Sequence, residues 1–214
     1  MTRETVRTTY DAVASRYAEA MVGELDARPI ERALLGHVMK DALGAIADLG
    51  CGPGHVTEWL AARGADVFGL DLSPKMIDEA KARFPQRTFR VGSMLALEDP
   101  SASWGAAVAL YSIIHLTPDE RKKAFAGLAR VAKPNAPLLL SFHVSDAEHA
   151  MGSSIHLETW FETPVDLTGY FLDPEMVGAE LEAAGFAIRV RLVRDPVVEN
   201  EYTSRRCYFL AYRR

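Results

Sequence analysis

Glycine and aspartate residues that follow two consecutive apolar runs are the part of this sequence best suited to bind a ligand. The run at 45–49 leads into Gly50, Gly52 and Gly54. Because glycine lacks a Cβ, such a loop can adopt positive φ and let a bulky ligand approach the backbone, close to the N-terminus of the following helix. The second run ends at Asp71, 19 residues after Gly52, where strand–helix–strand units place an acceptor for ribose hydroxyl groups. These spacings predict a site for a nucleoside-bearing ligand.

The glycine spacing also bears on which nucleoside binds. A dinucleotide fingerprint, Gly-x-Gly-x-x-Gly counted from Gly50, requires a third glycine at the position of His55, and Pro53 interrupts the loop. These two departures disfavour an NAD-dependent oxidoreductase, which stays the less favoured alternative.

Three segments resemble, in order, the first motifs of class I S-adenosylmethionine-dependent methyltransferases. They are Asp-Leu-Gly-Cys-Gly-Pro-Gly (48–54), Leu-Asp-Leu-Ser-Pro-Lys-Met (70–76) and Val-Gly-Ser-Met (91–94). The resemblance implies that the glycine loop lies against the methionine part of the cofactor, that Asp71 binds both ribose hydroxyls and that the residues after the third strand border the adenine. The residues that it assigns to the cofactor are Tyr17, Asp48, Gly50, Gly52, Gly54, Asp71, Leu72, Met76, Ser93, Met94 and Tyr111.

Ser93 departs from the pattern, since many members of this family carry aspartate there. A serine hydroxyl can also accept a hydrogen bond from the adenine amino group. The serine therefore affects the strength of the contact with adenine and not its existence. The backbone of Met94 could contact the adenine as well.

Alternating strand and helix patterns predict an α/β fold. Apolar runs predict strands at 45–49, 66–70, 88–91, 106–114, 137–144, 187–193 and 205–212. Helical patterns lie between them at 55–63, 74–83, 117–132 and 173–184. This order predicts a doubly wound, seven-stranded, mainly parallel sheet, and the resemblance adds an antiparallel last strand. With 214 residues, of which 49% are hydrophobic, we expect a single domain over 1–214.

Two segments lie outside this alternation. In residues 1–42 the apolar pattern predicts two helices, at 5–21 and 29–42, which would form a cover. In the family that the chain resembles, such helices cover the cofactor. Residues 145–172 form an insertion at the carboxyl edge of the sheet, where we expect a substrate wall; a simple hydrophobic cover of the last helix is the alternative. The residues expected to contact the substrate are Tyr10, His143, His156, Trp160 and Phe161. For Tyr10 and Tyr17, ordinary packing of a helix on the core is an equal alternative.

Tyr111 and His115 follow the fourth strand and are the candidate catalytic residues. A sulfonium methyl is already activated, so alignment of the reactants alone can supply about 7 to 11 kcal/mol. A base is needed only if the acceptor must lose a proton. His115, with an ordinary pKa of about 6.5, suits that role, with Tyr111 orienting it or the substrate. A histidine that only caps the following helix or satisfies a backbone carbonyl is the alternative.

The charge of the chain and the absence of certain motifs limit the classes of substrate, metal and partner that we expect. The chain has 24 basic and 29 acidic side chains, and no basic stripe indicates binding to nucleic acid. Nucleobase amine methylation would require a Pro-Pro-aromatic box at 110–113, which reads Leu-Tyr-Ser-Ile instead. No acidic ligand follows the fourth strand before Asp119, so no metal is expected. No apolar signal segment or membrane-length run is present, and the two cysteines lack metal spacing, so we expect a cytoplasmic protein without a membrane partner, either monomer or homodimer.

Together these observations favour a methyltransferase that uses S-adenosylmethionine and a small, aromatic metabolite as acceptor. The attacking atom would be nitrogen, oxygen or an electron-rich ring carbon such as that of an indole. A non-catalytic S-adenosylmethionine-binding module is the main alternative. A cavity lined by aromatic side chains would favour the enzyme, and a sealed sheet edge would favour the module.

Overall fold

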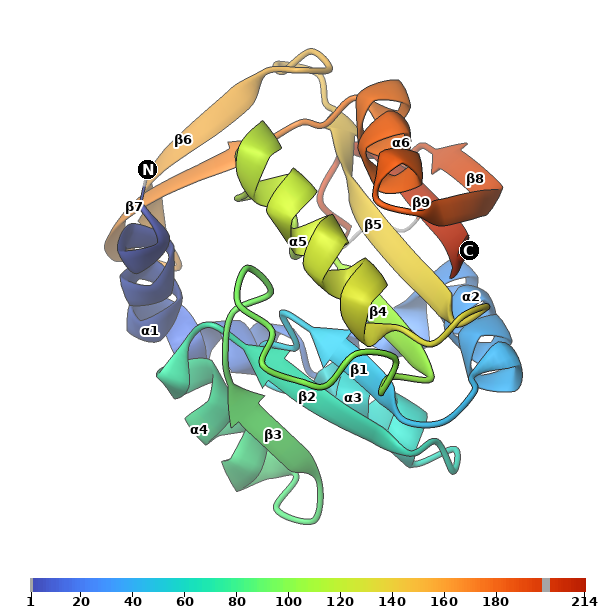
Figure 1. The fold of residues 1–214 in the computed structure, drawn as a ribbon. Coiled ribbons are helices and arrows are strands. Elements are labelled where there is room, and N and C mark those ends of the chain that lie inside the picture. Colours follow the sequence, from blue (N-terminus) through green and yellow to red (C-terminus); the bar gives the residue numbers. More distant parts are fainter. Residues whose placement is uncertain (1, 198–200) are drawn as a thin grey trace.

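A seven-stranded sheet forms the centre of the protein (Figure 1). The computed structural model describes residues 2–197 and 201–214. The strand order is β3-β2-β1-β4-β5-β9-β8, and only the pairs of β9 with β5 and β8 are antiparallel. The predicted doubly wound sheet with an antiparallel last strand is confirmed. Its strands are β1 (Ile46–Leu49), β2 (Val67–Asp71), β3 (Thr88–Val91), β4 (Ala106–Leu110), β5 (Pro137–Ser145), β8 (Phe186–Arg194) and β9 (Arg205–Arg213).

The helices begin at residues that suit helix N-termini. Ser73, Thr117 and Asp173 each accept a hydrogen bond from a backbone N–H of the first turn, and a proline follows each of them. Thr117 and Glu120 also form a capping box. The helices are α1 (Arg3–Ala20), η1 (Glu24–Ala27), α2 (Pro29–Asp41), α3 (His55–Ala61), α4 (Pro74–Arg83), α5 (Pro118–Val131) and α6 (Pro174–Ala183). None of the helices within the described ranges is long and apolar enough to cross a membrane.

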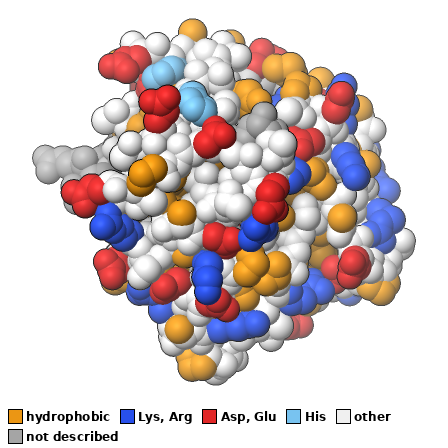
Figure 2. Space-filling model, turned by 90° about the vertical axis from the view of Figure 1, so that its left-hand side faces the viewer, with side chains coloured by type: hydrophobic (Ala, Val, Ile, Leu, Met, Phe, Trp, Pro, Cys, Tyr) orange, Lys and Arg blue, Asp and Glu red, His pale blue; other side chains and the backbone are white. Residues whose placement is uncertain are grey.

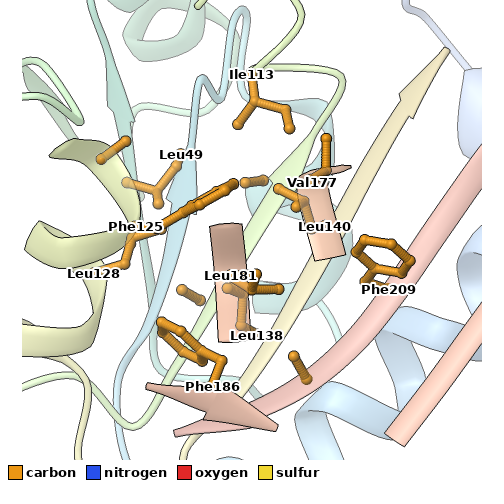
Figure 3. Close-up of a cluster of buried hydrophobic side chains, with 14 of the residues drawn as sticks. Leu49, Ile113, Phe125, Leu128, Leu138, Leu140, Val177, Leu181, Phe186 and Phe209 are labelled. Atoms are coloured by element: carbon orange, nitrogen blue, oxygen red, sulfur yellow. The ribbon is translucent and has the colours of Figure 1, made fainter. Parts of the chain in front are cut away.

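The central strands β1, β4 and β5 are buried on both faces of the sheet, which explains their continuous apolar runs. On one face, Phe125 of α5 and Leu181 of α6 pack against Leu138 and Leu140 of β5 (Figure 3). Leu139, between them, points to the opposite face and packs in a second cluster with α2 and α3. These two layers hold the carboxyl ends of the parallel strands in fixed positions.

The fourth strand is shorter than the sequence predicts. A strand is expected over 106–114, but β4 ends at Leu110. Tyr111 has φ of 54°, in the left-handed region that side chains rarely adopt, and its N–H donates to the carbonyl of Ser141 at 3.0 Å. The chain therefore leaves the sheet at Tyr111, four residues before His115.

The insertion contains a β-hairpin that the sequence analysis does not predict. Strands β6 (Ser154–Trp160) and β7 (Thr163–Tyr170) pair with each other and form a sheet of their own. Phe161 and Glu162 connect them with φ of 48° and 56°, as in the two-residue turns of tight hairpins. The hairpin lies beside α1 in Figure 1. The same side of the molecule, seen directly in Figure 2, carries acidic and basic side chains interspersed with apolar ones.

A buried ion pair fixes the segment that follows His115. Arg121 donates to both carboxylate oxygens of Glu180, at 2.8 and 2.9 Å, and to the carbonyl of Leu116 at 3.1 Å. Both side chains are almost fully buried. The pair therefore joins α5 and α6 to the chain beside the predicted catalytic histidine.

We expect Arg121→Met to destabilise the fold by about 3–5 kcal/mol, because it leaves the Glu180 carboxylate buried without its partner. The double variant Arg121→Met, Glu180→Met removes both charges and should recover most of that loss. Urea denaturation of the two variants measures the difference. Equal stability of the single and double variants would contradict this account of the pair.

Candidate functional site

A cavity of about 600 Å³ lies at the carboxyl ends of the parallel strands. Its floor consists of the loops that follow β1 to β4, and α1 and the β6–β7 hairpin line it from the other side. The volume is within the roughly 300–1,000 Å³ that is typical of small-molecule sites. The cavity brings together most of the predicted site residues, namely Tyr10, Tyr17, Asp48, Gly50, Gly52, Asp71, Leu72, Ser93, Met94, Tyr111, His115, His143, Trp160 and Phe161.

Asp71 links the two loops that form one half of the floor. Its Oδ2 accepts a hydrogen bond from the N–H of Gly52 and its Oδ1 accepts one from the N–H of Ser73, each at 2.8 Å. Burial raises the pKa of the Asp71 carboxyl, while these two N–H donors favour the charged form. Each oxygen keeps a free acceptor direction, and the side chain lines the cavity.

The glycine loop is tightly constrained. Gly50 and Gly52 have φ of 67° and 52°. A Cβ on Gly50 would lie 2.4 Å from the Cβ of Ser112, so no larger residue fits there without a shift of the chain. A Cβ on Gly52 would meet only the ring of Tyr17, at 3.7 Å. The backbone of Gly52 is therefore exposed toward the cavity and the Tyr17 ring.

Asp48 and Ser93 complete this half of the site. Asp48 accepts a hydrogen bond from the hydroxyl of Thr57 at 2.6 Å, and burial raises its pKa to about 6. The hydroxyl oxygen of Ser93 accepts a hydrogen bond from the N–H of Leu95 at 3.2 Å, which fixes the turn after β3. Both side chains line the cavity.

The other half of the cavity is aromatic. Trp160 of the hairpin contacts Tyr10 and Tyr17 of α1 edge-on, with ring centroids 5.6 and 5.4 Å apart. Phe161 stacks on Trp160 at 5.3 Å. Such edge-on and offset contacts are the favourable arrangements of aromatic pairs. They join α1 to the tip of the hairpin and leave an apolar wall over the floor.

His115 is held between α1 and the hairpin. It is 8% exposed, and its Nδ1 lies 2.7 Å from the carbonyl oxygen of Thr168 while its Nε2 lies 2.8 Å from the hydroxyl of Tyr10. Burial lowers its pKa to about 4, so the ring is neutral near pH 7. Because a carbonyl oxygen can only accept, Nδ1 carries the proton and Nε2 accepts from Tyr10.

Tyr111 does not contact His115 through any hydrogen bond of the described residues. Its hydroxyl donates to Tyr208 at 2.8 Å, and its ring stacks on His143 at 4.9 Å. Of the two roles expected for Tyr111, orientation of His115 is therefore corrected, and Tyr10 takes that position; orientation of the substrate stays a prediction. The cause is the left-handed backbone of Tyr111, which ends the strand there.

His143 lines the cavity from β5. Its Nδ1 is hydrogen-bonded to the hydroxyl of Ser204 at 2.6 Å. Burial, and then the positive charge of Arg206, lower its pKa to about 3. His143 is therefore neutral near pH 7, as is His115.

Three predicted contacts lie outside the cavity lining. A Cβ on Gly54 would lie 2.6 Å from the ring of Phe89, so this glycine allows close packing of the loop on β3. Met76 is fully buried in a cluster with residues of α1. The His156 side chain is 51% exposed on the hairpin. For Gly54, Met76 and His156 the predicted ligand contact therefore does not match their position.

Charged and polar residues that the sequence analysis does not single out also line the cavity. Arg28 comes just before the proline that starts α2, and His55 follows the glycine loop. For both residues, the neighbouring sequence feature is the signal that could have indicated a place in the site. His55 is paired with Glu24 at 3.1 Å. These additional residues are Arg3, Glu24, Arg28, Glu31, His55, Ser112, Tyr202 and Arg206.

Residues 46–135 match the model of a family described as a methyltransferase domain. This segment is therefore a methyltransferase domain of the class I S-adenosylmethionine-dependent type. An uncharacterized methyltransferase of Synechocystis sp. is 32% identical over 126 residues, which are 58% of this chain and 57% of that protein. A trans-aconitate 2-methyltransferase of Methylobacterium radiotolerans is 45% identical over 73 residues, which are 33% of this chain and 25% of that protein.

The similarity in fold to a solved methyltransferase structure covers nearly the whole chain. The crystal structure of magnesium protoporphyrin IX methyltransferase from Synechocystis, with bound S-adenosylmethionine, has a TM-score of 0.71 at 20% identity, and the match covers 99% of this chain and 97% of that one. In sequence, the chain spans only between a quarter and just over half the length of the two curated relatives.

The residues of the cavity fit S-adenosylmethionine, the cofactor of this family. The exposed backbone of Gly52 would face the methionine part, and the free acceptor directions of Asp71 would meet the ribose hydroxyls. Ser93 and Met94 would border the adenine. Asp48 and Asp71 also place carboxyl groups on the cavity wall, which suits a ligand that carries a sulfonium and an ammonium group.

We expect Asp71→Ala to weaken binding of S-adenosylhomocysteine by roughly ten- to a hundredfold, because hydrogen bonds to a charged acceptor contribute about 1.5 to 3 kcal/mol each. Calorimetric titration measures this. Asp78→Ala is the matched control, since Asp78 is exposed on α4 and pairs with Lys75. Unchanged affinity of a folded Asp71→Ala variant would contradict the ribose assignment.

Gly52→Val should abolish detectable binding of S-adenosylhomocysteine, because the new side chain would stand between the loop and the ligand. The matched control is Gly64→Val. Gly64 also has a positive φ, of 90°, but a Cβ there meets nothing within 4 Å. Both variants should lose stability through backbone strain, and only Gly52→Val should lose the ligand in the same titration.

Proposed function

We propose that this chain transfers the methyl group of S-adenosylmethionine to a small acceptor with an aromatic or apolar face. The observation that carries the proposal is one continuous cavity. It runs from Gly52 and Asp71, where the cofactor residues gather, to the rings of Tyr10, Trp160 and Phe161. A binding module has no need of this second half, so the aromatic wall favours the enzyme over the non-catalytic alternative.

The comparisons support a small organic acceptor. The relatives include a trans-aconitate 2-methyltransferase and, at the level of fold, a magnesium protoporphyrin IX methyltransferase. The aromatic wall adds that the acceptor here presents an apolar surface, because stacked and edge-on rings favour planar or apolar groups.

Catalysis by this chain rests mainly on alignment and exclusion of water. S-adenosylmethionine, when bound, supplies an electrophilic methyl group. The contacts between α1 and the hairpin cover the floor, so the acceptor would be held in a low-dielectric site with few orientations. Alignment of this kind contributes about 7 to 11 kcal/mol.

For an acceptor that must lose a proton, the structure offers Tyr10 and His115 as a relay. The acceptor proton would pass to the hydroxyl oxygen of Tyr10 as the Tyr10 proton passes to Nε2 of His115. The resulting imidazolium keeps its Nδ1–H bond to the carbonyl of Thr168. Tyr10 ends unchanged, and His115 carries the proton.

The direct test is methyl transfer from S-adenosylmethionine to a panel of phenols, aryl amines and indoles, with S-adenosylhomocysteine formation as the readout. Turnover with members of this panel supports the proposal. Tight cofactor binding with no turnover on any of them would favour the binding module instead.

His115→Asn and Tyr10→Phe separate proton transfer from positioning. If the relay operates, each variant should bind S-adenosylhomocysteine within a few-fold of the wild type and turn over an acidic acceptor roughly 10² to 10⁴ times more slowly. An acceptor that loses no proton should be unaffected. Retention of the rate by His115→Asn would show that His115 only positions Tyr10.

The pH dependence follows from the lowered pKa of His115, which is about 4. The imidazole stays neutral above pH 6, so its titration should not change the rate between pH 6 and 8.5. As pH falls through about 4, Nε2 takes up a proton and proton transfer stops. The unfolded chain, with a histidine pKa of about 6.5, takes up that proton first, so stability also declines between these two values. A rate that halves near pH 6.5 would contradict the burial of His115.

A further inference from the structure

Three arginines line the cavity, and in the part of the chain that the structure describes only one of them lacks an ion pair. Arg28 pairs with Glu24 at 3.3 Å and with Glu201 at 2.8 Å. Arg206 also pairs with Glu201. Arg3 has no salt bridge or hydrogen-bond partner among the described residues, and its Nε and Nη1 atoms are inaccessible to solvent.

Glu120, the carboxylate whose charge raises the pKa of Arg3, is already engaged. Glu120 accepts hydrogen bonds from the N–H and the hydroxyl of Thr117, at 2.9 and 3.1 Å, and forms no ion pair with Arg3. Burial lowers the pKa of Arg3, and the charge of Glu120 only partly opposes this. The charge of Arg3 also helps to lower the pKa of His115, which locates the guanidinium near the aromatic half of the cavity.

Each acid that lines the cavity has its own partners. Asp48 and Asp71 belong to the floor loops, and Asp71 is held by two backbone N–H groups. Glu24 pairs with Arg28 and His55, and Glu31 with Arg194. The lining near Arg3 and His115 is apolar and includes Val6, Ile114, Leu167 and Tyr170. The acceptor half therefore presents a cation without a matching anion.

The position of Arg3 opposes stability. It is the first residue of α1, where the helix dipole disfavours a positive charge. Burial of a guanidinium without a partner adds a further cost. A ligand that carries a negative charge would supply the missing partner and remove both penalties.

We propose that Arg3 binds a carboxylate of the methyl acceptor, so that the acceptor is a small aromatic or apolar acid. The guanidinium carries a permanent charge, and Nη2, which is not among its buried nitrogens, can donate to a carboxylate oxygen. This inference rests on the proposed function, because it names the chemical class of the acceptor that the same cavity takes.

The test compares acids with their neutral amides. Calorimetric titrations use protein saturated with S-adenosylhomocysteine and two matched pairs of probes: indole-3-carboxylate with indole-3-carboxamide, and 4-hydroxybenzoate with 4-hydroxybenzamide. The wild type should bind at least one acid ten times or more tightly than its amide. Arg3→Met, which keeps the length and removes the charge, should abolish that preference, and Arg3→Lys should keep part of it.

Arg7→Met is the matched control. Arg7 lies one turn along α1, pairs with Glu4 and Asp11, and does not line the cavity, so this variant should keep the acid preference. Arg3→Met should melt at or above the wild-type temperature, because it removes an unpaired charge from a helix N-terminus. That result distinguishes lost recognition from lost folding.

Three outcomes would overturn the proposal. The first is equal binding of acids and amides by the wild type, and the second is an acid preference that survives in Arg3→Met. The third is a loss of S-adenosylhomocysteine affinity in Arg3→Met, which would assign Arg3 to the methionine carboxylate instead. The binding readout requires no methyl transfer. An acid preference that depends on Arg3 without any turnover would therefore overturn the proposed function and leave the assignment of Arg3 standing.

Discussion

The two backbone hydrogen bonds to Asp71 are the constraint on which the site depends. The bond from Gly52 ties the loop after β1 to the loop after β2, and the bond from Ser73 fixes the carboxylate within its own loop, so that the exposed backbone of Gly52 and the carboxylate lie side by side on one floor. The sheet supplies the frame, since parallel strands end at the same edge. The bond from Gly52 adds to those that the N–H groups of Gly50 and Cys51 donate to the carbonyl of Leu70, and together they fix the glycine loop with its positive φ values. The carboxylate thus shapes the loop and also faces the ligand.

A second polar contact joins the cover to the floor. His115 receives a hydrogen bond from Tyr10 of α1 and donates one to the carbonyl of Thr168 in β7, so one buried ring connects three segments that are far apart in the sequence. Burial keeps this ring neutral, and a neutral imidazole can make both bonds at once. The aromatic contacts of Trp160 surround the same junction. The cover is therefore positioned by a few specific contacts above a rigid sheet.

The sequence predicts the cofactor half far better than the acceptor half. Gly50, Gly52 and Asp71 follow strands whose apolar pattern is strong, so their meeting at one edge follows from the fold. The sequence does not predict the turn at Tyr111 or the β6–β7 hairpin, because both use left-handed residues other than glycine, which carry no local signal. Nor does it predict the role proposed for Arg3, since a missing partner is visible only when the surrounding side chains are in place.

Because the β6–β7 hairpin is not part of the main sheet, its sequence can change during evolution with little effect on that sheet. β6 and β7 form a sheet of their own, and near their base the backbone of Tyr170 bonds to that of Ile114 and the backbone of Leu172 to that of His143. The hairpin meets α1 mainly through side chains, with two further bonds from Arg16 to the Phe161 carbonyl and from Thr9 to the Asp166 carbonyl. Changes at the tip can therefore accumulate without disturbing the sheet or the glycine loop. Such an arrangement lets acceptor choice evolve independently of the cofactor, and it marks the hairpin as a natural unit for exchange in protein engineering.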